Sequence, residues 1–365
     1  MNRKMFSNFN WVYFSIILLI SILGVVIIYS ANHGRPEEFF RSLYIKQIFR
    51  VCLGLVVMLF AIFVDYRFWG RNAYLIYAIT IVFLIWTLFF GNIASGARRW
   101  IRVGPLILQV SEFAKFALII ILAKYYAKKK HDGKYKLVNL IIPAIYTGII
   151  CFLISLQPDL GTAMIILFVF GIFVLASEMY TSTLVKLCCA GLISIPMLWF
   201  ILKDYQKTRV LTLFNPELDP LGAGYHAIQS KIAIGSGGFS GQGLFAGSQS
   251  RLNFLPEKHT DFIFSVFAEE MGFIGVTVLM ILYIYIILKG LNIAYKAADR
   301  FGLFLAIGII GSIAFYIIVN IGMTIGLFPI TGIPLPLLSY GGSSLISTYF
   351  AFGLLLNIEM RRDIR

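Results

Sequence analysis

Uncharged apolar runs of about 17–25 residues recur along the whole chain, and each is long enough to cross a bilayer as a helix. We count ten such runs in the 365 residues. They lie at about 11–30, 45–64, 73–90, 111–127, 137–156, 160–177, 182–202, 261–288, 302–326 and 337–358. The fourth is the weakest, because Glu112 and Lys115 interrupt its start. The predicted fold class is therefore all-α: a polytopic integral membrane protein with about ten transmembrane helices.

The composition supports this class. Apolar residues make up 59% of the chain and charged residues 13%, whereas a soluble chain carries nearer a quarter charged residues. These values exclude a soluble enzyme and a disordered chain. The net charge of +14 would suggest nucleic acid in a soluble protein. Here the basic residues lie between apolar runs, so we attribute them to topology and to membrane lipids, and we expect no nucleic-acid partner.

An even number of spans places both termini on one side of the membrane. Loops on that side carry more Lys and Arg than the short loops on the other side, with the densest cluster at 124–136. The positive-inside rule then predicts an N-in, C-in orientation. It also makes the loop 203–260, between helices seven and eight, extracytoplasmic. Within that loop, the helical spacing of Tyr225, Ile228 and Ile232 predicts an amphipathic helix in the interface.

Ionisable groups in a bilayer are costly and usually mark function. Glu112 and Lys115 are three residues apart, so they share one helix face. They form either an ion pair that makes a helix end tolerable in lipid, or part of an outer cavity with Lys115 meeting an anionic substrate group. Asp159 begins the sixth span, where it can cap the helix, and this role is compatible with a place in the same cavity.

Arginines and a further carboxylate stand on the same predicted outer side. Arg98, Arg99 and Arg102 flank Trp100, so they either reach lipid headgroups or bind a diphosphate, whose oxygens match the guanidinium fork. Asp261 enters the eighth span and is followed by apolar residues. It is either a helix cap or a general base whose pKa is raised by its apolar surroundings.

Two glycine-containing segments complete the candidate site. The run GSGGFSGQG at 235–243 is either a turn in a long loop or a set of backbone amides that bind phosphate. The segment PLPLLSYGGSS at 334–344 predicts a broken or re-entrant helix, which is tolerated at membrane depth where it is buried in protein or lines a cavity.

Four stretches together resemble the SEDS family (shape, elongation, division and sporulation) of membrane proteins. They are GARRW at 96–100, QPDLGT at 157–162, HTDFIF at 259–264 and the 334–344 segment, and the similarity spans nearly the whole chain. We therefore treat 1–365 as a single transmembrane SEDS domain. Lys258, the AEE triplet at 268–270 and QSKIA at 229–233 resemble the elongation branch rather than the division branch.

The resemblance implies a peptidoglycan glycosyltransferase that polymerises lipid II in the cytoplasmic membrane, with Asp261 as the catalytic residue. It implies a class B penicillin-binding protein and other elongation-complex membrane proteins as partners. A divalent cation, Mg²⁺ or Mn²⁺, is a possible cofactor, with metal ligands unassigned. The expected substrate-binding residues are Arg98, Arg99, Glu112, Lys115, Asp159, Lys258, His259, Ser339 and Gly341.

Two other functions fit parts of the pattern. A lipid II flippase would show ionisable groups or broken helices near the midplane, where Glu269 and Glu270 are the deep candidates. A non-catalytic scaffold for the penicillin-binding protein would tolerate polar substitutions in the cavity. Neither function explains a carboxylate at the start of helix eight as directly as catalysis does.

Overall fold

The computed structural model describes residues 8–33, 42–94, 97–104, 106–128, 134–220, 222–252, 254–255 and 257–363. Its long helices are α2 (Trp11–Asn32), α4 (Leu43–Phe63), α6 (Ala73–Phe90), α7 (Val110–Lys128), α8 (Ile141–Leu156), α9 (Leu160–Ala176), α10 (Thr181–Ile201), α14 (Ile263–Tyr295), α15 (Arg300–Thr324) and α16 (Gly342–Met360). Shorter elements are α5 (Tyr66–Arg71), η1 (Leu137–Leu140), α11 (Asp204–Phe214), η2 (Pro216–Leu218), α12 (Ala223–Ser236) and α13 (Ser248–Arg251). The strands are β1 (Asn92–Ala94), β2 (Ala97–Val103) and β3 (Leu106–Gln109).

Each of the ten predicted spans corresponds to one long helix, which confirms the all-α membrane fold. Within the described residues, seven helices are long and apolar enough to span a membrane, and α9 contains a shorter apolar stretch, as does α10. Two predicted boundaries were wrong. Helix α14 continues to Tyr295, and α16 begins at Gly342 rather than at 337. Residues 325–341 contain no helix, because their prolines and glycines do not sustain one.

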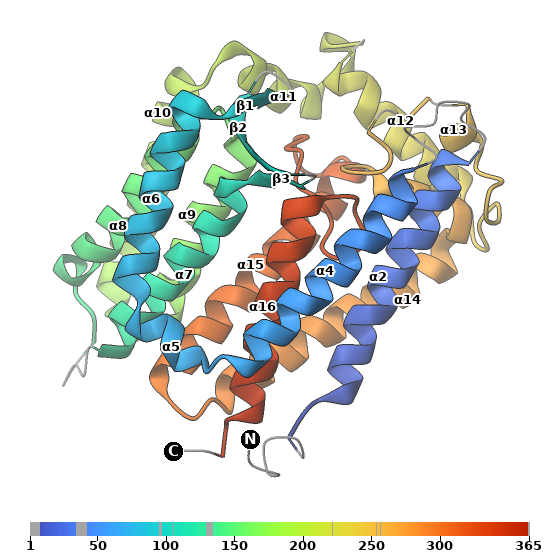
Figure 1. The fold of residues 1–365 in the computed structure, drawn as a ribbon. Coiled ribbons are helices and arrows are strands. Elements are labelled where there is room, and N and C mark those ends of the chain that lie inside the picture. The colour runs from blue at the N-terminus through green and yellow to red at the C-terminus, as the bar shows by residue number, and fades with distance from the viewer. Residues whose placement is uncertain are drawn as a thin grey trace.

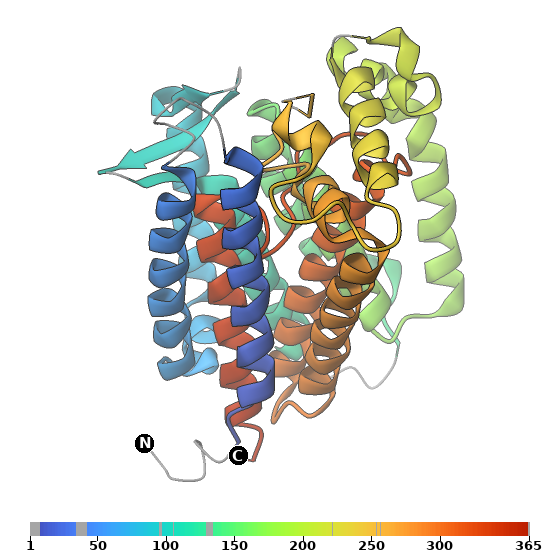
Figure 2. The same cartoon turned by 90° about the vertical axis from the view of Figure 1, so that its right-hand side faces the viewer.

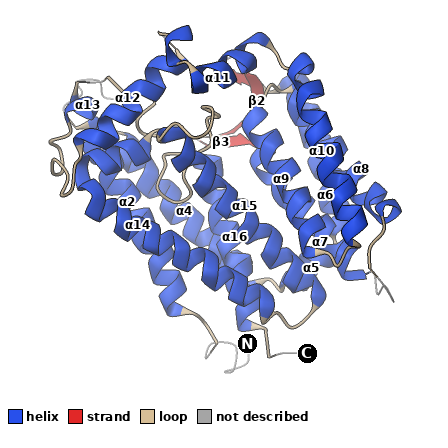
Figure 3. Ribbon diagram, turned by 180° about the vertical axis from the view of Figure 1, so that it is seen from behind, coloured by secondary structure: helices blue, strands red, loops and turns tan. Residues whose placement is uncertain are grey.

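Both termini lie at one end of the helix bundle, as an even number of spans requires (Figures 1 and 2). Asn8 Nδ2 donates to Asp363 Oδ2 at 2.7 Å, so the two chain ends are adjacent. The strands and helices α11–α13 lie at the opposite end (Figures 1 and 3). We call these the terminal end and the loop end.

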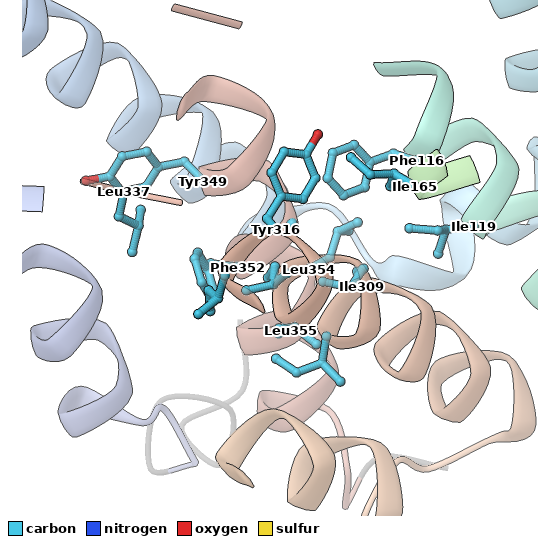
Figure 4. Packing of buried hydrophobic residues seen from close by; sticks show 14 of the residues in the cluster. Phe116, Ile119, Ile165, Ile309, Tyr316, Leu337, Tyr349, Phe352, Leu354 and Leu355 are labelled. Carbon is cyan, nitrogen blue, oxygen red and sulfur yellow. The ribbon is translucent and has the colours of Figure 1, made fainter. Parts of the chain in front are cut away.

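Helix α16 is almost entirely buried and packs against α4, α7, α14 and α15. Figure 4 shows its side chains Tyr349, Phe352, Leu354 and Leu355 in the apolar cluster with residues of α7, α9 and α15. A Cβ added to Gly353 would lie 2.6 Å from the carbonyl oxygen of Met58 on α4. Small residues thus let α4 and α16 approach closely, as membrane helices commonly do.

The loop end differs most from the sequence prediction. The outer loop after α6 forms a three-stranded antiparallel sheet in the order β1-β2-β3. No strand was expected from the sequence in this loop. The predicted helix is present as α12, and its place in the membrane interface stays a prediction. Its Ile228 and Ile232 are exposed, while Gly224, Ser230 and Ala233 form the buried face.

The glycine-rich run at 235–243 supplies hydrogen-bond partners to the backbone where α14 is interrupted. Gly272 has a φ of 61°, which interrupts the helix. The amides of Gln242 and Gly243 donate to the carbonyls of Glu269 and Glu270, each at 3.0 Å, and the Phe273 amide donates to the Gly238 carbonyl at 3.0 Å. The run therefore satisfies backbone groups that a broken membrane helix leaves open. It does not line the cavity described below, so the phosphate-binding interpretation is not supported.

Candidate active site

A cavity of about 730 Å³ lies at the loop end, a volume typical of a site for a small molecule or a headgroup. Residues from several segments far apart in sequence surround it. Its polar and charged lining residues are Arg99, Gln109, Glu112, Asp159, Thr162, Lys203, Tyr205, Arg209, Glu257, Thr260, Asp261, Tyr316, Thr331, Tyr340, Ser343 and Ser344. Four of the ten predicted site residues carry side chains in this set, and Gly341 adds its backbone.

Asp261 stands in the turn just before α14 and faces the cavity. Asn320 Nδ2 donates to the Asp261 carbonyl at 3.0 Å and to the Ile333 carbonyl at 2.7 Å, which fixes the turn against the non-helical segment. Gly332, with a φ of 72°, lies behind the carboxylate, where a Cβ would be 3.4 Å from Oδ2. Burial is the largest influence on the carboxyl group, followed by the negative charge of Glu257, and the pKa of Asp261 is raised to about 6.

Asp159 is both the helix cap and a cavity residue. Its carboxylate accepts the Thr162 amide at 3.2 Å, which is the cap, and Thr162 Oγ1 at 2.9 Å. Gln109 Nε2 and Ser111 Oγ donate to Oδ2 at 2.8 and 3.1 Å. Arg99 Nη1 pairs with Oδ1 at 3.2 Å. Asp159 therefore joins the sheet to α7 and α9, and it holds Arg99 at the cavity wall.

Glu112 and Lys115 form a buried ion pair at 2.6 Å. Lys115 Nζ also donates to the Tyr316 hydroxyl at 2.7 Å, and that hydroxyl donates to Glu112 Oε1 at 2.8 Å. Ser347 Oγ donates to Glu112 Oε2 at 3.1 Å. Glu112 and Tyr316 line the cavity, whereas Lys115 lies behind them. This geometry matches the ion-pair interpretation and places Lys115 where it supports Glu112 rather than meets a substrate.

The cationic side of the cavity differs from the predicted one. Arg98 is exposed, donates to the Phe89 carbonyl at 3.1 Å and does not line the cavity. Lys203 and Arg209 do line it, and Arg209 Nη1 donates to the Ile330 carbonyl at 3.1 Å. These two residues were missed because they belong to the long loop, where nothing in the sequence indicates which side chains turn inward. Arg99 is the predicted arginine that reaches the site.

The other predicted site residues support the cavity wall. Lys258 is 2% exposed and lies outside the cavity. Ser339 Oγ accepts the Leu335 amide at 2.8 Å, which closes the turn before α16. The His259 ring contacts Tyr340 edge-on, at 5.5 Å between centroids, and its carbonyl accepts the Tyr340 amide at 2.8 Å. Gly341 contributes backbone to the lining.

Two of the cavity carboxylates are engaged with basic side chains. Glu112 pairs with Lys115, and Asp159 pairs with Arg99. Among the described residues, no three His, Cys, Asp or Glu side chains converge as metal ligands. The divalent cation stays a prediction.

Replacing Asp261 with Asn should stabilise the protein at pH 8 and change little at pH 4. The folded-state pKa of about 6 lies above the ordinary value of 3.8, so stability falls as pH rises through this window and the native carboxylate ionises. Ionisation of Asp261 lowers the free energy of unfolding by up to about 2 kcal/mol, allowing for partial solvent screening. Thermal melts of both proteins from pH 4 to 8 would measure it, with the exposed Asp204→Asn as control. If the two proteins differed in melting temperature by the same amount at every pH, the ionisation of Asp261 would not be the cause.

Comparison with known proteins shows the family of this chain. Residues 10–364 match the family model of the FtsW/RodA/SpoVE cell cycle proteins. The chain is 40% identical over 351 residues to the peptidoglycan glycosyltransferase MrdB of Escherichia coli K12, covering 96% of this chain and 93% of that protein. It is 33% identical over 428 residues to the peptidoglycan glycosyltransferase RodA of Treponema pallidum, covering 98% of each.

Solved structures show the same fold. A chain from a peptidoglycan synthase complex that coordinates polymerisation and crosslinking superposes with a TM-score of 0.82 at 34% identity, covering 98% of this chain and 99% of that one. The rod-shape-determining protein RodA of Thermus thermophilus superposes with a TM-score of 0.71 at 29% identity, covering 97% of both chains. On this evidence, the chain belongs to the FtsW/RodA/SpoVE family of cell cycle proteins.

Proposed function

We propose that this protein is a peptidoglycan glycosyltransferase of the elongation type that polymerises lipid II at the outer face of the bacterial cytoplasmic membrane. The observation that carries this proposal is the place of Asp261. Its half-buried carboxylate shares a headgroup-sized cavity with Arg99, Lys203 and Arg209. A base beside fixed cations is what glycosyl transfer from a diphosphate requires. The relatives named peptidoglycan glycosyltransferase support the same reaction.

In the proposed reaction, Asp261 accepts the proton of the acceptor GlcNAc 4-hydroxyl. The hydroxyl oxygen attacks C1 of the donor MurNAc, and the bond from C1 to the phosphate oxygen breaks with inversion. The undecaprenyl diphosphate leaves with the electron pair, and Arg99, Lys203 and Arg209 offset its charge. These three residues replace the Arg98, Arg99 and Lys115 set expected from the sequence.

The membrane orientation follows from charge and fold together. Both termini lie at the terminal end, and the Lys- and Arg-rich connections predict that this end faces the cytoplasm. The cavity is then on the outer side, where the headgroup of lipid II lies in water. The spans carry many exposed apolar side chains, which membrane lipids would cover.

We also propose a class B penicillin-binding protein as the partner, together with other elongation-complex membrane proteins. The structural neighbour from a synthase complex supports this assignment. No nucleic-acid partner is proposed, because the surplus of positive charge is explained by topology.

Polymerisation of lipid II in liposomes is the direct test. The purified protein would be reconstituted with a penicillin-binding partner that has no active glycosyltransferase domain. Glycan strands that disappear with Asp261→Ala are the expected result. Labelled lipid II that crosses the bilayer without polymer would instead indicate a flippase. Glu269 and Glu270 argue against that outcome, since their carboxylates accept bonds from Gln249 and Ser30 at the loop end.

A matched pair of arginine variants tests the cationic wall. Arg99→Ala should lower kcat/KM for lipid II about 10- to 100-fold, the value of a charge-assisted bond to phosphate. Arg98 is the neighbouring residue outside the cavity, and Arg98→Ala should keep kcat/KM within about twofold of wild type. Steady-state polymerisation over a range of lipid II concentrations measures both. Equal losses in the two variants would mean that the arginines act through lipid headgroups.

A further inference from the structure

The turn that carries Asp261 presents a second carboxylate to the cavity, Glu257, four residues earlier. Glu257 has a φ of 46°, in the left-handed region that residues other than glycine seldom adopt. Such a backbone is strained and persists where the surrounding structure enforces it, commonly at functional sites. Here the Glu257 carbonyl accepts the amides of Thr260 at 3.1 Å and Phe262 at 3.4 Å. The strained turn thus brings Glu257, Thr260 and Asp261 to one wall.

The Thr260 hydroxyl connects the two carboxylates. Its Oγ1 donates to Glu257 Oε2 at 3.1 Å and to the Glu257 carbonyl at 3.2 Å, and it also lies in hydrogen-bond reach of the Asp261 carboxylate. A hydroxyl has one proton, so it serves one acceptor well at a time. The charge on Glu257 therefore decides how much of this proton is available to Asp261.

The other charges near Asp261 come from different elements. Arg209 on α11 and Arg99 on β2 lower the pKa of Asp261, and Thr260 does the same through its hydrogen bond. Glu257 raises it and is the negatively charged member of this set. The cavity carboxylates Glu112 and Asp159 are each ion-paired. On α12, the charges of Asp219 and Glu257 raise the pKa of His226, and the charge of Arg209 lowers it.

We propose that Glu257 is a positioning residue that makes Asp261 a stronger base, through its charge and through the shared Thr260 hydroxyl. This role rests on the proposed function. An ionised Asp261 flanked by Arg99 and Arg209 alone would be a weak proton acceptor. A negative charge on the same turn offsets the two arginines. The strained backbone at Glu257 keeps that charge at the cavity wall.

The pH profile of polymerisation by the full chain with its partner tests this role. The wild-type acid limb should have its midpoint near pH 6, where Asp261 ionises. Glu257→Gln should move it lower by up to about one unit, since the like charge is removed and Glu257 is exposed to screening solvent. At neutral pH, kcat should fall about threefold with KM unchanged, because the base is weaker.

Thr260→Val should move the acid limb in the opposite direction, because the ionised Asp261 loses a hydrogen bond. Asp204→Asn is the control, since Asp204 is a fully exposed carboxylate outside the cavity. A limb that stays in place or moves upward in Glu257→Gln overturns the proposal. So does a loss of rate that is equal at every pH, which is what a merely structural role predicts.

A second readout does not depend on turnover. The gap in melting temperature between each protein and its Asp261→Asn derivative follows the ionisation of Asp261 as pH changes. Its midpoint should be lower in the Glu257→Gln background than in wild type. An unmoved midpoint overturns the role of Glu257. Absence of polymer from the folded wild-type complex would instead overturn the proposed function. The midpoint of the melting-temperature gap would still show whether Glu257 affects the ionisation of Asp261.

Discussion

Asp261→Asn should reduce lipid II polymerisation by about 10²–10⁴-fold, the usual contribution of a positioned base. The amide has nearly the same shape as the carboxylate but cannot accept the proton of the acceptor hydroxyl. The bonds that fix this turn, from Asn320 to the backbone carbonyls of Asp261 and Ile333, do not involve the replaced atoms. The loss should therefore appear in kcat, with binding of lipid II largely retained.

The measurement is single-turnover polymerisation in liposomes with the partner present, beside a binding assay with labelled lipid II. Asp204→Asn replaces a fully exposed carboxylate that does not line the cavity, and this variant should behave as wild type. A folded Asp261→Asn protein that retains more than about a tenth of wild-type polymerisation would remove Asp261 from the reaction. Full retention would favour the scaffold interpretation.

The helices could be predicted because hydrocarbon thickness fixes how long an apolar run must be. The strands could not. The segment 92–109 is short and mixes arginines with apolar residues, and its pairing of Trp100 with both Asn92 and Gln109 depends on contacts between strands. The start of α16 was also misplaced, because 337–341 is largely buried without being helical.

The candidate site was predictable where a single helix or turn defines it. The spacing of Glu112 and Lys115 indicates their ion pair, and the position of Asp159 indicates its cap. Their remaining partners are far away in sequence: Tyr316 is 204 residues from Glu112. Arg98 and Arg99 are neighbours, yet one is exposed and the other reaches the cavity. A sequence motif shows which residues gather at a site but not which way each side chain points.

Lys115→Met should lower the free energy of unfolding by about 3–5 kcal/mol, the cost of leaving one member of a buried ion pair without its partner. Glu112 and Lys115 are 4% and 2% exposed, so water cannot replace the ammonium group. Tyr316 and Ser347 would still donate to Glu112, but hydrogen bonds from two hydroxyls do not neutralise its charge. Unfolding in mixed micelles by denaturing detergent measures the loss.

The double variant Glu112→Gln with Lys115→Met should recover most of this stability, since no unpaired charge remains and the introduced amide oxygen can still accept from the Tyr316 hydroxyl. Measuring Glu112→Gln alone completes the cycle and isolates the coupling between the two groups. Lys115→Met should also weaken lipid II binding, because the unpaired Glu112 disturbs the cavity wall. If Lys115 only supports Glu112 behind that wall, the double variant should regain this binding. Restored stability with binding still lost would show that the ammonium group itself meets the substrate, in contrast to its position beneath Glu112 and Tyr316.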